Sequence, residues 1–311
     1  MEEKILYYLN EIKKLQNKEF VPPVTCEIDP SNACPLNCGF CMFKKYLDQS
    51  NVHMSMENYL RLIYDLHRIG TKSITFTGGG EPLMNPNFNK FVDIAEDLGF
   101  EMGLVTNGVL LEKLNRPNRF KFIRVSLDAS DSTTYINVKG ADYFDKVIEN
   151  VKNTLKQNPT VGLSYVVCPE NEKGIVEAQN LANQLGVAYI QIKPAYLDGK
   201  IYKFKKPGDT EETIETKRYK LRSKLPCLLA HLVGIVTADG GVYYCCQHRG
   251  IPNFYLGSIA QEQFSTIWQR RLNHNNFSLS QCPMCRYANY AKYLSETLSK
   301  GDLFFEHKNF L

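Results

Sequence analysis

The feature that most constrains the fold is a regular alternation of short β-rich runs and amphipathic helical stretches between Val24 and Pro194. Repeating β-then-α units imply parallel strands joined by right-handed crossovers. Six such units predict an α/β fold, a partial (β/α)6 TIM-type barrel with its functional residues on the loops after the strands. The predicted strands cover residues 24–29, 72–77, 101–106, 121–127, 160–167 and 187–193. The predicted helices cover residues 56–69, 87–98, 110–115, 142–157 and 171–185.

The pattern changes on both sides of this region. An apolar stripe at helical spacing near the start of the chain predicts an amphipathic helix. Near the other end, the turn Asp239-Gly240 between two β-rich runs predicts a hairpin, and a helix is expected over 261–272. The predicted parts are an N-terminal amphipathic helix (1–20), the barrel (21–195), a connector (196–226) and a small C-terminal β-hairpin/α domain (227–311).

Composition narrows the function classes. The chain of 311 residues is 43% hydrophobic and 23% charged, as in ordinary globular proteins. Its net charge of +4 comes from a basic surplus between residues 200 and 224, whereas a nucleic-acid binder shows a broader basic face. We therefore expect no nucleic-acid partner. The sequence has no apolar run of bilayer length and no signal peptide, so we expect no membrane partner and a cytoplasmic location. In the reducing cytoplasm, ten cysteines favour metal binding over disulfides.

Three cysteines, Cys34, Cys38 and Cys41, lie within eight residues on the loop after the first predicted strand. A four-iron cluster ordinarily takes four protein ligands, so three thiolates leave one iron open. An open coordination position is where a substrate or cofactor binds. On spacing alone the trio fits such a cluster or a structural zinc knuckle. Its place at the functional end of the predicted barrel favours the cluster.

A second group of cysteines lies in the predicted C-terminal domain. A hairpin and a Cys-x-x-Cys loop that together supply four thiols suit structural zinc or a four-iron cluster, and the residue types do not separate the two metals. Neighbouring side chains on a strand face opposite ways, so Cys245 and Cys246 are not both expected to bind one metal. The group comprises Cys227, Cys245 or Cys246, Cys282 and Cys285.

Three glycines follow the second predicted strand, in the run Gly78-Gly79-Gly80-Glu81. Glycine lets the backbone approach a ligand closely and adopt angles closed to other residues. The run lacks the Lys-Ser/Thr ending of a P-loop, and taken alone it suits a tight turn as well as a cofactor loop. Because it lies at the same end of the barrel as the cysteine trio, we favour the cofactor loop.

In combination, these residues resemble the radical S-adenosylmethionine superfamily. The spacing Cys34-x3-Cys38-x2-Cys41 is similar to its cluster-binding motif. The glycine run is similar to its second-strand motif, whose backbone contacts the methionine group of the cofactor. The ends of the third and fourth strands also resemble the family, in which polar side chains there hold the ribose or carboxylate. The cofactor-binding residues that the resemblance implies are Phe40, Gly79, Gly80, Glu81, Asn107 and Ser126.

The C-terminal domain resembles the twitch form of the SPASM domain, which holds one auxiliary cluster. Full SPASM domains hold two clusters and need further cysteines after the last pair, and this chain has none after Cys285. The resemblance therefore implies a single auxiliary [4Fe-4S] cluster, with the choice between Cys245 and Cys246 left open. The implied ligands are Cys227, Cys245, Cys282 and Cys285.

In enzymes of this kind, the open iron of the first cluster binds S-adenosylmethionine, and one-electron reduction gives a 5′-deoxyadenosyl radical that abstracts a hydrogen atom. The implied partners are a small-molecule substrate and a one-electron reductant such as flavodoxin or ferredoxin. If the auxiliary cluster then accepts an electron, the outcome is a dehydrogenation. If a thiol donates hydrogen, it is an epimerisation, with Cys246 or Cys168 as donor; either could instead be a small buried residue. Lys193, at the end of the sixth predicted strand, could bind an anionic substrate or the cofactor carboxylate, or could instead lie at the surface.

Three function classes follow. The first is an oxidoreductase or epimerase acting on a sugar, cyclitol or nucleoside-like compound. The second is an enzyme that epimerises or crosslinks a ribosomally made peptide. Such enzymes commonly carry a leader-recognition domain or two auxiliary clusters, and the sequence indicates neither, which favours the first class. The third is a zinc protein in which both cysteine groups are structural.

Overall fold

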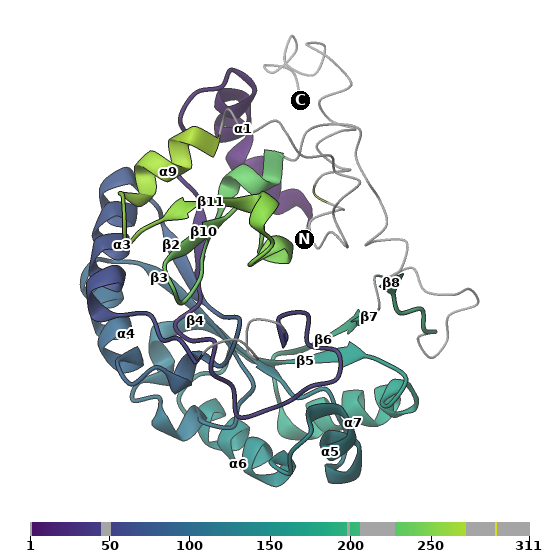
Figure 1. Ribbon diagram of the computed structural model, residues 1–311. Coiled ribbons are helices and arrows are strands. Elements are labelled where there is room, and N and C mark those ends of the chain that lie inside the picture. The colour runs from purple at the N-terminus through teal and green to yellow at the C-terminus, as the bar shows by residue number, and fades with distance from the viewer. Residues whose placement is uncertain (1, 45–50, 198–199, 206–227, 272–289, 291–311) are drawn as a thin grey trace, which may run out of the picture.

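The computed structural model describes residues 2–44, 51–197, 200–205, 228–271 and 290. Within these residues, nine strands form one curved sheet in the order β11-β10-β9-β1-β2-β3-β4-β5-β6. Each neighbouring pair from β1 to β6 is parallel, and the connecting helices lie on the convex outer side (Figure 1). The barrel strands are β1 (Thr25–Ile28), β2 (Ser73–Phe76), β3 (Glu101–Thr106), β4 (Phe120–Ser126), β5 (Val161–Val167) and β6 (Tyr189–Pro194). The predicted partial barrel is confirmed.

Helix α3 (Met56–Ile69) shows why the predicted helices form where they do. The Ser55 hydroxyl accepts a hydrogen bond from the Asn58 amide at 3.1 Å, and Gly70 ends the helix in the left-handed conformation at φ 90°. Between these caps, one apolar face is buried in the core. The other barrel helices are α4 (Phe88–Asp97), α5 (Ser132–Lys139), α6 (Phe144–Leu155) and α7 (Ile175–Leu185). Short 3-10 helices are η2 (Pro82–Met84), η4 (Pro117–Arg119) and η5 (Glu172–Gly174).

One helix prediction was wrong, and one helix was not predicted. The expected helix over 110–115 is a single 3-10 turn, η3 (Leu111–Lys113). Its space is limited because Gly108 has φ 85° just before it and Pro117 follows shortly after. Helix α5 was not predicted, since its buried residues do not repeat as a clear apolar stripe.

The C-terminal region extends the barrel sheet. Strand β9 (Val233–Val236) lies parallel to β1 on the side opposite β2, so Cys26 pairs with Ile74 on one side and Gly234 on the other. A Cβ atom at Gly234 would lie 3.0 Å from the Cys26 Sγ atom, and Cys26 is fully buried. The predicted hairpin forms from β9 and β10 (Gly241–Tyr243), and β11 (Tyr255–Ser258) pairs with β10. Further C-terminal elements are η6 (Leu228–Leu232), η7 (Cys246–His248), η8 (Pro252–Phe254) and α9 (Phe264–Arg270).

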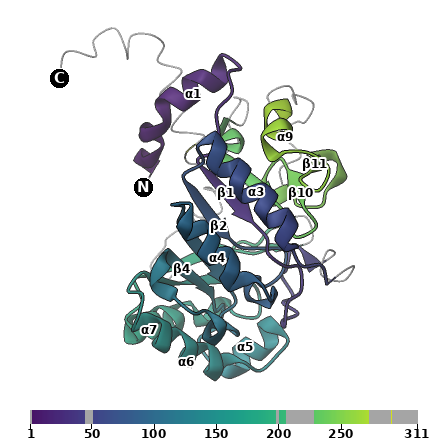
Figure 2. The same cartoon turned by 90° about the vertical axis from the view of Figure 1, so that its left-hand side faces the viewer.

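The N-terminal segment packs at this end of the sheet, as Figure 2 shows for α1 above β1. It begins as the 3-10 helix η1 (Glu2–Tyr8) and continues as α1 (Leu9–Gln16). Ile5, Ile12 and Leu15 are buried in a cluster with Leu232. The predicted connector holds a short antiparallel pair, β7 (Tyr196–Leu197) and β8 (Lys200–Ile201). Among the described residues, each helix is too short or too polar to pass through a bilayer.

Candidate active site

A cavity of about 300 Å³ lies at the carboxyl ends of the barrel strands. The loops after β1 and β2, the ends of β3, β4 and β6, and the segment around η7 all contribute to its wall. Parallel strands present their carboxyl ends at one edge, which is where α/β folds place their ligand sites. The predicted residues that line it are Cys34, Cys38, Phe40, Cys41, Gly79, Gly80, Glu81, Asn107, Ser126, Lys193 and Cys246.

The cysteine trio lies half-buried on the loop after β1. A turn joins the Cys41 amide to the Cys38 carbonyl at 3.2 Å, and the Asn107 side-chain amide donates to the Cys34 Sγ atom at 3.6 Å. Burial raises the pKa of the Cys34 thiol to about 11 and also raises the pKa of Cys38. The thiols of Cys34 and Cys38 therefore favour their protonated forms until a cation or metal offsets the lost hydration.

The glycine loop packs directly on the cysteine loop. The Gly80 amide donates to the Ser31 carbonyl at 3.0 Å, and the Glu81 amide donates to the Ala33 carbonyl at 2.8 Å. A Cβ atom at Gly80 would lie 2.3 Å from the Ala33 carbonyl oxygen, so only glycine fits there. Gly80 thus joins the two loops that the sequence assigned to cluster and cofactor.

Glu81 places its side chain in the protein interior. One carboxylate oxygen accepts hydrogen bonds from the Thr106 hydroxyl at 2.7 Å and the Leu83 amide at 3.2 Å. The other accepts from the Asn107 amide at 2.7 Å. Burial raises the pKa of Glu81 to about 7, although these three hydrogen bonds act in the opposite direction. The side chain therefore ties the loop after β2 to the end of β3 and orients Asn107 toward the cavity.

A buried ion pair that the sequence did not reveal lies beside the trio. The Lys139 ammonium, at the end of α5, bonds to the Asp128 carboxylate just beyond β4, and both residues line the cavity. They are 2% and 0% exposed. In the sequence, this helix is marked by Asp131, which caps its start, and by Gly140, which follows its last turn.

Cys245 and Cys246 differ in their contact with the cavity. Cys246 is 3% exposed and lines the barrel cavity. Cys245 does not line it, and packs both against the cluster of Ala230, Tyr244 and Phe254 and against that of Ile235, Tyr243 and Cys246. Their sulfur atoms are 4.0 Å apart.

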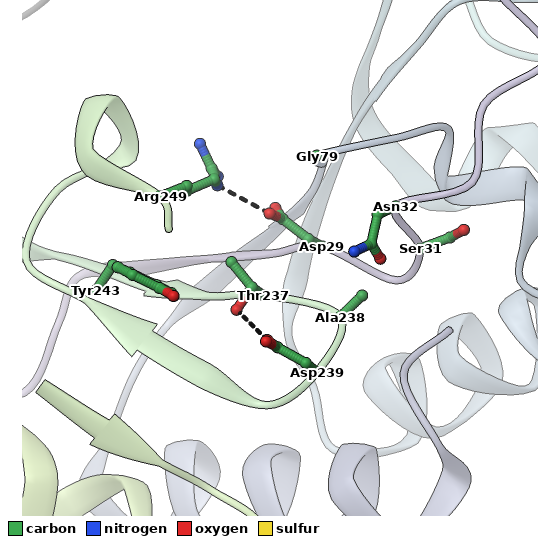
Figure 3. Close-up of a pocket in the computed structure, with 9 residues that line it drawn as sticks. All are labelled: Asp29, Ser31, Asn32, Gly79, Thr237, Ala238, Asp239, Tyr243 and Arg249. Atoms are coloured by element: carbon green, nitrogen blue, oxygen red, sulfur yellow. Dashed lines mark hydrogen bonds and ion pairs between the residues drawn. The ribbon is translucent and has the colours of Figure 1, made fainter. Parts of the chain in front are cut away.

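A second buried ion-pair network connects η7 to the first barrel strand. The Arg249 guanidinium lies 2.8 Å from a Glu27 carboxylate oxygen and 2.9 Å from one of Asp29. Burial raises the pKa of Asp29 to about 6 against the opposing effect of Arg249. Figure 3 shows Arg249 directed at Asp29 beside Gly79, in a small side pocket of about 30 Å³. The hairpin turn closes this pocket, where Thr237 donates to Asp239 at 2.6 Å.

The remaining predicted residues fall elsewhere. Cys168 is buried against Val138 and Ala195 and is not part of the cavity wall. Cys26 is in the core, as its place in β1 requires. Cys227, Cys282 and Cys285 lie outside the described residues.

Two family models match the chain. One is the radical SAM superfamily, over residues 28–182, and the other is the SPASM iron-sulfur cluster-binding domain, over residues 227–287. The chain belongs to the radical SAM superfamily. It carries a C-terminal SPASM domain, and the two matches together cover about two thirds of this chain.

The chain is also similar to individual proteins. The GTP 3′,8-cyclase of Clostridium perfringens is 29% identical over 182 residues, or 54% of each chain, so the match spans about half the length of that cyclase. A Pyrococcus furiosus protein, the tungsten-containing aldehyde ferredoxin oxidoreductase cofactor-modifying protein, is 22% identical over 87% of this chain and 89% of its own. Streptococcus suis SuiB, in its crystal structure bound to precursor peptide SuiA, has a TM-score of 0.63 at 15% identity, covering 86% of this chain and 69% of SuiB. SuiB shares the fold.

The cavity residues suit the cofactors of the radical SAM superfamily. Among the described residues, no three His, Cys, Asp or Glu side chains converge on one point as ligands of a single metal ion. An iron-sulfur cluster takes each thiolate on a separate iron, and three thiols facing one cavity fit that requirement. The buried Tyr135 hydroxyl has no hydrogen-bond partner among the described residues, and burial raises its pKa.

Proposed function

We propose that this radical SAM enzyme binds a [4Fe-4S] cluster at Cys34, Cys38 and Cys41 and S-adenosylmethionine beside the glycine loop. The observation that carries this proposal is the single cavity that the cysteine trio shares with Gly79, Gly80 and Ser126. When bound, the cluster and S-adenosylmethionine supply a 5′-deoxyadenosyl radical that takes a hydrogen atom from the substrate. The cofactor-binding residues in this proposal are Phe40, Gly79, Gly80, Glu81, Asn107 and Ser126.

We further propose a small, polar substrate, such as a sugar, a cyclitol or a nucleoside-like compound. The cavity wall supports this choice, since Arg124 and Lys193 line it together with Ser126. These side chains suit a molecule with hydroxyl or anionic groups. Similarity to a cyclase named for GTP agrees with a nucleotide-like compound. The reductant would be a flavodoxin or ferredoxin.

The C-terminal thiols divide between two roles in this proposal. Cys245 does not line the cavity, which supports its assignment as an auxiliary-cluster ligand together with Cys227, Cys282 and Cys285. One auxiliary cluster would accept an electron in a dehydrogenation. Cys246 faces the cavity, which supports it as the donor of a hydrogen atom in an epimerisation.

The first experiment tests the cofactor site. The anaerobically reconstituted enzyme should contain seven or eight irons, and with dithionite and S-adenosylmethionine it should form 5′-deoxyadenosine, measured by mass spectrometry. The triple variant Cys34→Ala, Cys38→Ala, Cys41→Ala should lose about half of its iron and all of this activity, while Cys168→Ala keeps both. A triple variant that still cleaves S-adenosylmethionine, or a wild type that binds only zinc, would overturn the assignment.

The second experiment identifies the substrate and the outcome. Deuterated sugars, cyclitols and nucleotides are offered in turn, and deuterium in 5′-deoxyadenosine marks the substrate. If the reaction is an epimerisation, product formed in deuterated water carries solvent deuterium in the wild type and in Cys168→Ala, but not in Cys246→Ala. Deuterium transfer from a peptide alone would favour the alternative, a peptide-modifying enzyme. SuiB, whose fold this chain shares, binds the precursor peptide SuiA in its crystal structure.

A further inference from the structure

The buried pair Lys139–Asp128 is more extensively supported than an ordinary ion pair. Asp128 accepts a second hydrogen bond from the Val166 amide at 2.7 Å, and its own carbonyl accepts one from the Asn171 side chain at 2.8 Å. Asp128 also has φ 59°, a left-handed backbone conformation that is uncommon outside glycine. Strand β5 and the loop after it therefore fix the carboxylate that holds Lys139.

The end of α5 also holds the backbone of the cysteine loop. The Asn37 amide donates to the Lys139 carbonyl at 2.9 Å, and the Gly39 amide donates to the Val138 carbonyl at 3.3 Å. These two hydrogen bonds flank Cys38 on either side and use carbonyls that a helix end leaves without partners. Gly140 permits the contact, because a Cβ atom there would lie 3.2 Å from the Asn37 carbonyl oxygen and its φ is 72°.

The ammonium group of Lys139 faces the trio. It lies 5.5 Å from the centre of the Phe40 ring, which stands between Cys38 and Cys41 in the sequence. Lys139 also lines the cavity that Cys34, Cys38 and Cys41 share. The mechanism proposed above gives neither Lys139 nor Asp128 a role.

We propose that Lys139, held by Asp128, is a positioning residue that balances the charge of the first cluster and raises its reduction potential. This inference rests on the proposed assignment of that cluster to Cys34, Cys38 and Cys41.

The physical reason is electrostatic. Uptake of one electron from an external reductant adds one negative charge to the cluster. A buried cation close to a cluster ligand stabilises the more negative, reduced form more than the oxidised form, because water does not screen it. A buried carboxylate acts in the opposite direction. The two members of the pair should therefore shift the potential with opposite signs.

The test is a potentiometric titration followed by electron paramagnetic resonance, reading the signal that responds to added S-adenosylmethionine. Lys139→Met should lower the midpoint potential, and Asp128→Asn should raise it. Lys139→Arg, which keeps the positive charge, should have the wild-type potential. Lys146→Met is the matched control, since it removes a lysine that pairs with Glu112 at 2.9 Å on the surface, and it should leave the potential unchanged. An unshifted potential in Lys139→Met, with full iron content, would overturn the inference.

Lys139→Met leaves a buried carboxylate without its cation and can fail to fold. The double variant Lys139→Met, Asp128→Asn removes both charges, so it keeps the inference testable. Its potential should lie below that of the single variant Asp128→Asn, because it removes the Lys139 charge from a protein in which residue 128 is already neutral. A double variant at or above the potential of Asp128→Asn contradicts the inference. Failure of the underlying cluster assignment is distinguished separately, by iron retained in the cysteine-trio variant.

Discussion

At the scale of single residues, buried charges connect the C-terminal region to the barrel. Arg249 is 6% exposed and pairs with Glu27 and Asp29, which are 3% and 2% exposed. Taking three charges out of water is costly, and the attraction of Arg249 to the two carboxylates offsets that cost only while Arg249 is present. The network is therefore sensitive to the loss of its cation.

We predict that Arg249→Met lowers the free energy of unfolding by about 3–5 kcal/mol, because two buried carboxylates lose their partner. Urea denaturation followed by circular dichroism, under anaerobic conditions, measures the change. Arg270→Met is the matched control, since Arg270 is half-exposed and pairs with Glu262 at the surface, and it should cost less than about 1 kcal/mol. Equal losses in the two variants would contradict the prediction.

The buried imidazole of His231 predicts a dependence on pH. Burial, followed by the nearby charge of Arg271, lowers its pKa to about 3, and the Tyr244 hydroxyl lies 3.1 Å from Nε2. Because the folded-state pKa is below the unfolded value, this residue contributes stability above about pH 6.5 and loses it as the pH falls toward 3.

The wild type should thus lose more unfolding free energy between pH 7.5 and 5.5 than His231→Gln does. Urea titrations at the two pH values give the comparison, with His67→Gln as a control at an exposed histidine. Indistinguishable pH profiles for the wild type and His231→Gln would show the prediction to be wrong.

At the scale of elements, α5 has only eight residues, and its start depends on one side chain. The Asp131 carboxylate accepts from the Thr134 amide at 2.8 Å and from the Thr134 hydroxyl at 2.7 Å. We predict that Asp131→Ala lowers the free energy of unfolding by about 1 kcal/mol and that Asp131→Asn, which keeps the capping oxygen, costs less. Urea denaturation tests both variants, and an equal loss in the two would argue against a capping role.

The same helix shows where sequence patterns succeed and fail. Helix α3 was predicted at its observed bounds, because Ser55 and Gly70 cap an unbroken apolar stripe. Helix α5 lacks such a stripe, and one of its three buried residues is Lys139. Without that helix, Lys139 could not be assigned to the site. The cysteine and glycine loops were predictable because each directly follows a β-rich run of the chain.

At the scale of the whole molecule, strand pairing distant in sequence decides the architecture. Strand β9 pairs with β1 from more than 200 residues away, and no local pattern encodes that register. The sequence therefore predicted a separate C-terminal hairpin, whereas β9 to β11 continue the barrel sheet. A side-chain contact also links the C-terminal region to the segment before β1, since the Trp268 indole donates to the Val21 carbonyl at 2.8 Å.

This continuity predicts that the barrel and the β9–α9 region unfold together. Trp268 is the single tryptophan of the chain, so its fluorescence reports the C-terminal side, while far-ultraviolet circular dichroism reports the whole. The two urea transitions should coincide at one midpoint. Two separated midpoints would mean that the C-terminal region unfolds independently.

The fully buried thiol of Cys26 can report the rate at which the centre of the sheet opens. Gly234 and Ile74 flank it on the neighbouring strands, and burial raises the pKa of Cys26 far above the usual thiol range. An alkylating reagent reacts with thiolate, so it can label Cys26 only while β1 has separated from a neighbour. Peptide mapping of labelled chains over time would therefore give the opening rate of the strand that leads into the cysteine loop, without any engineered probe.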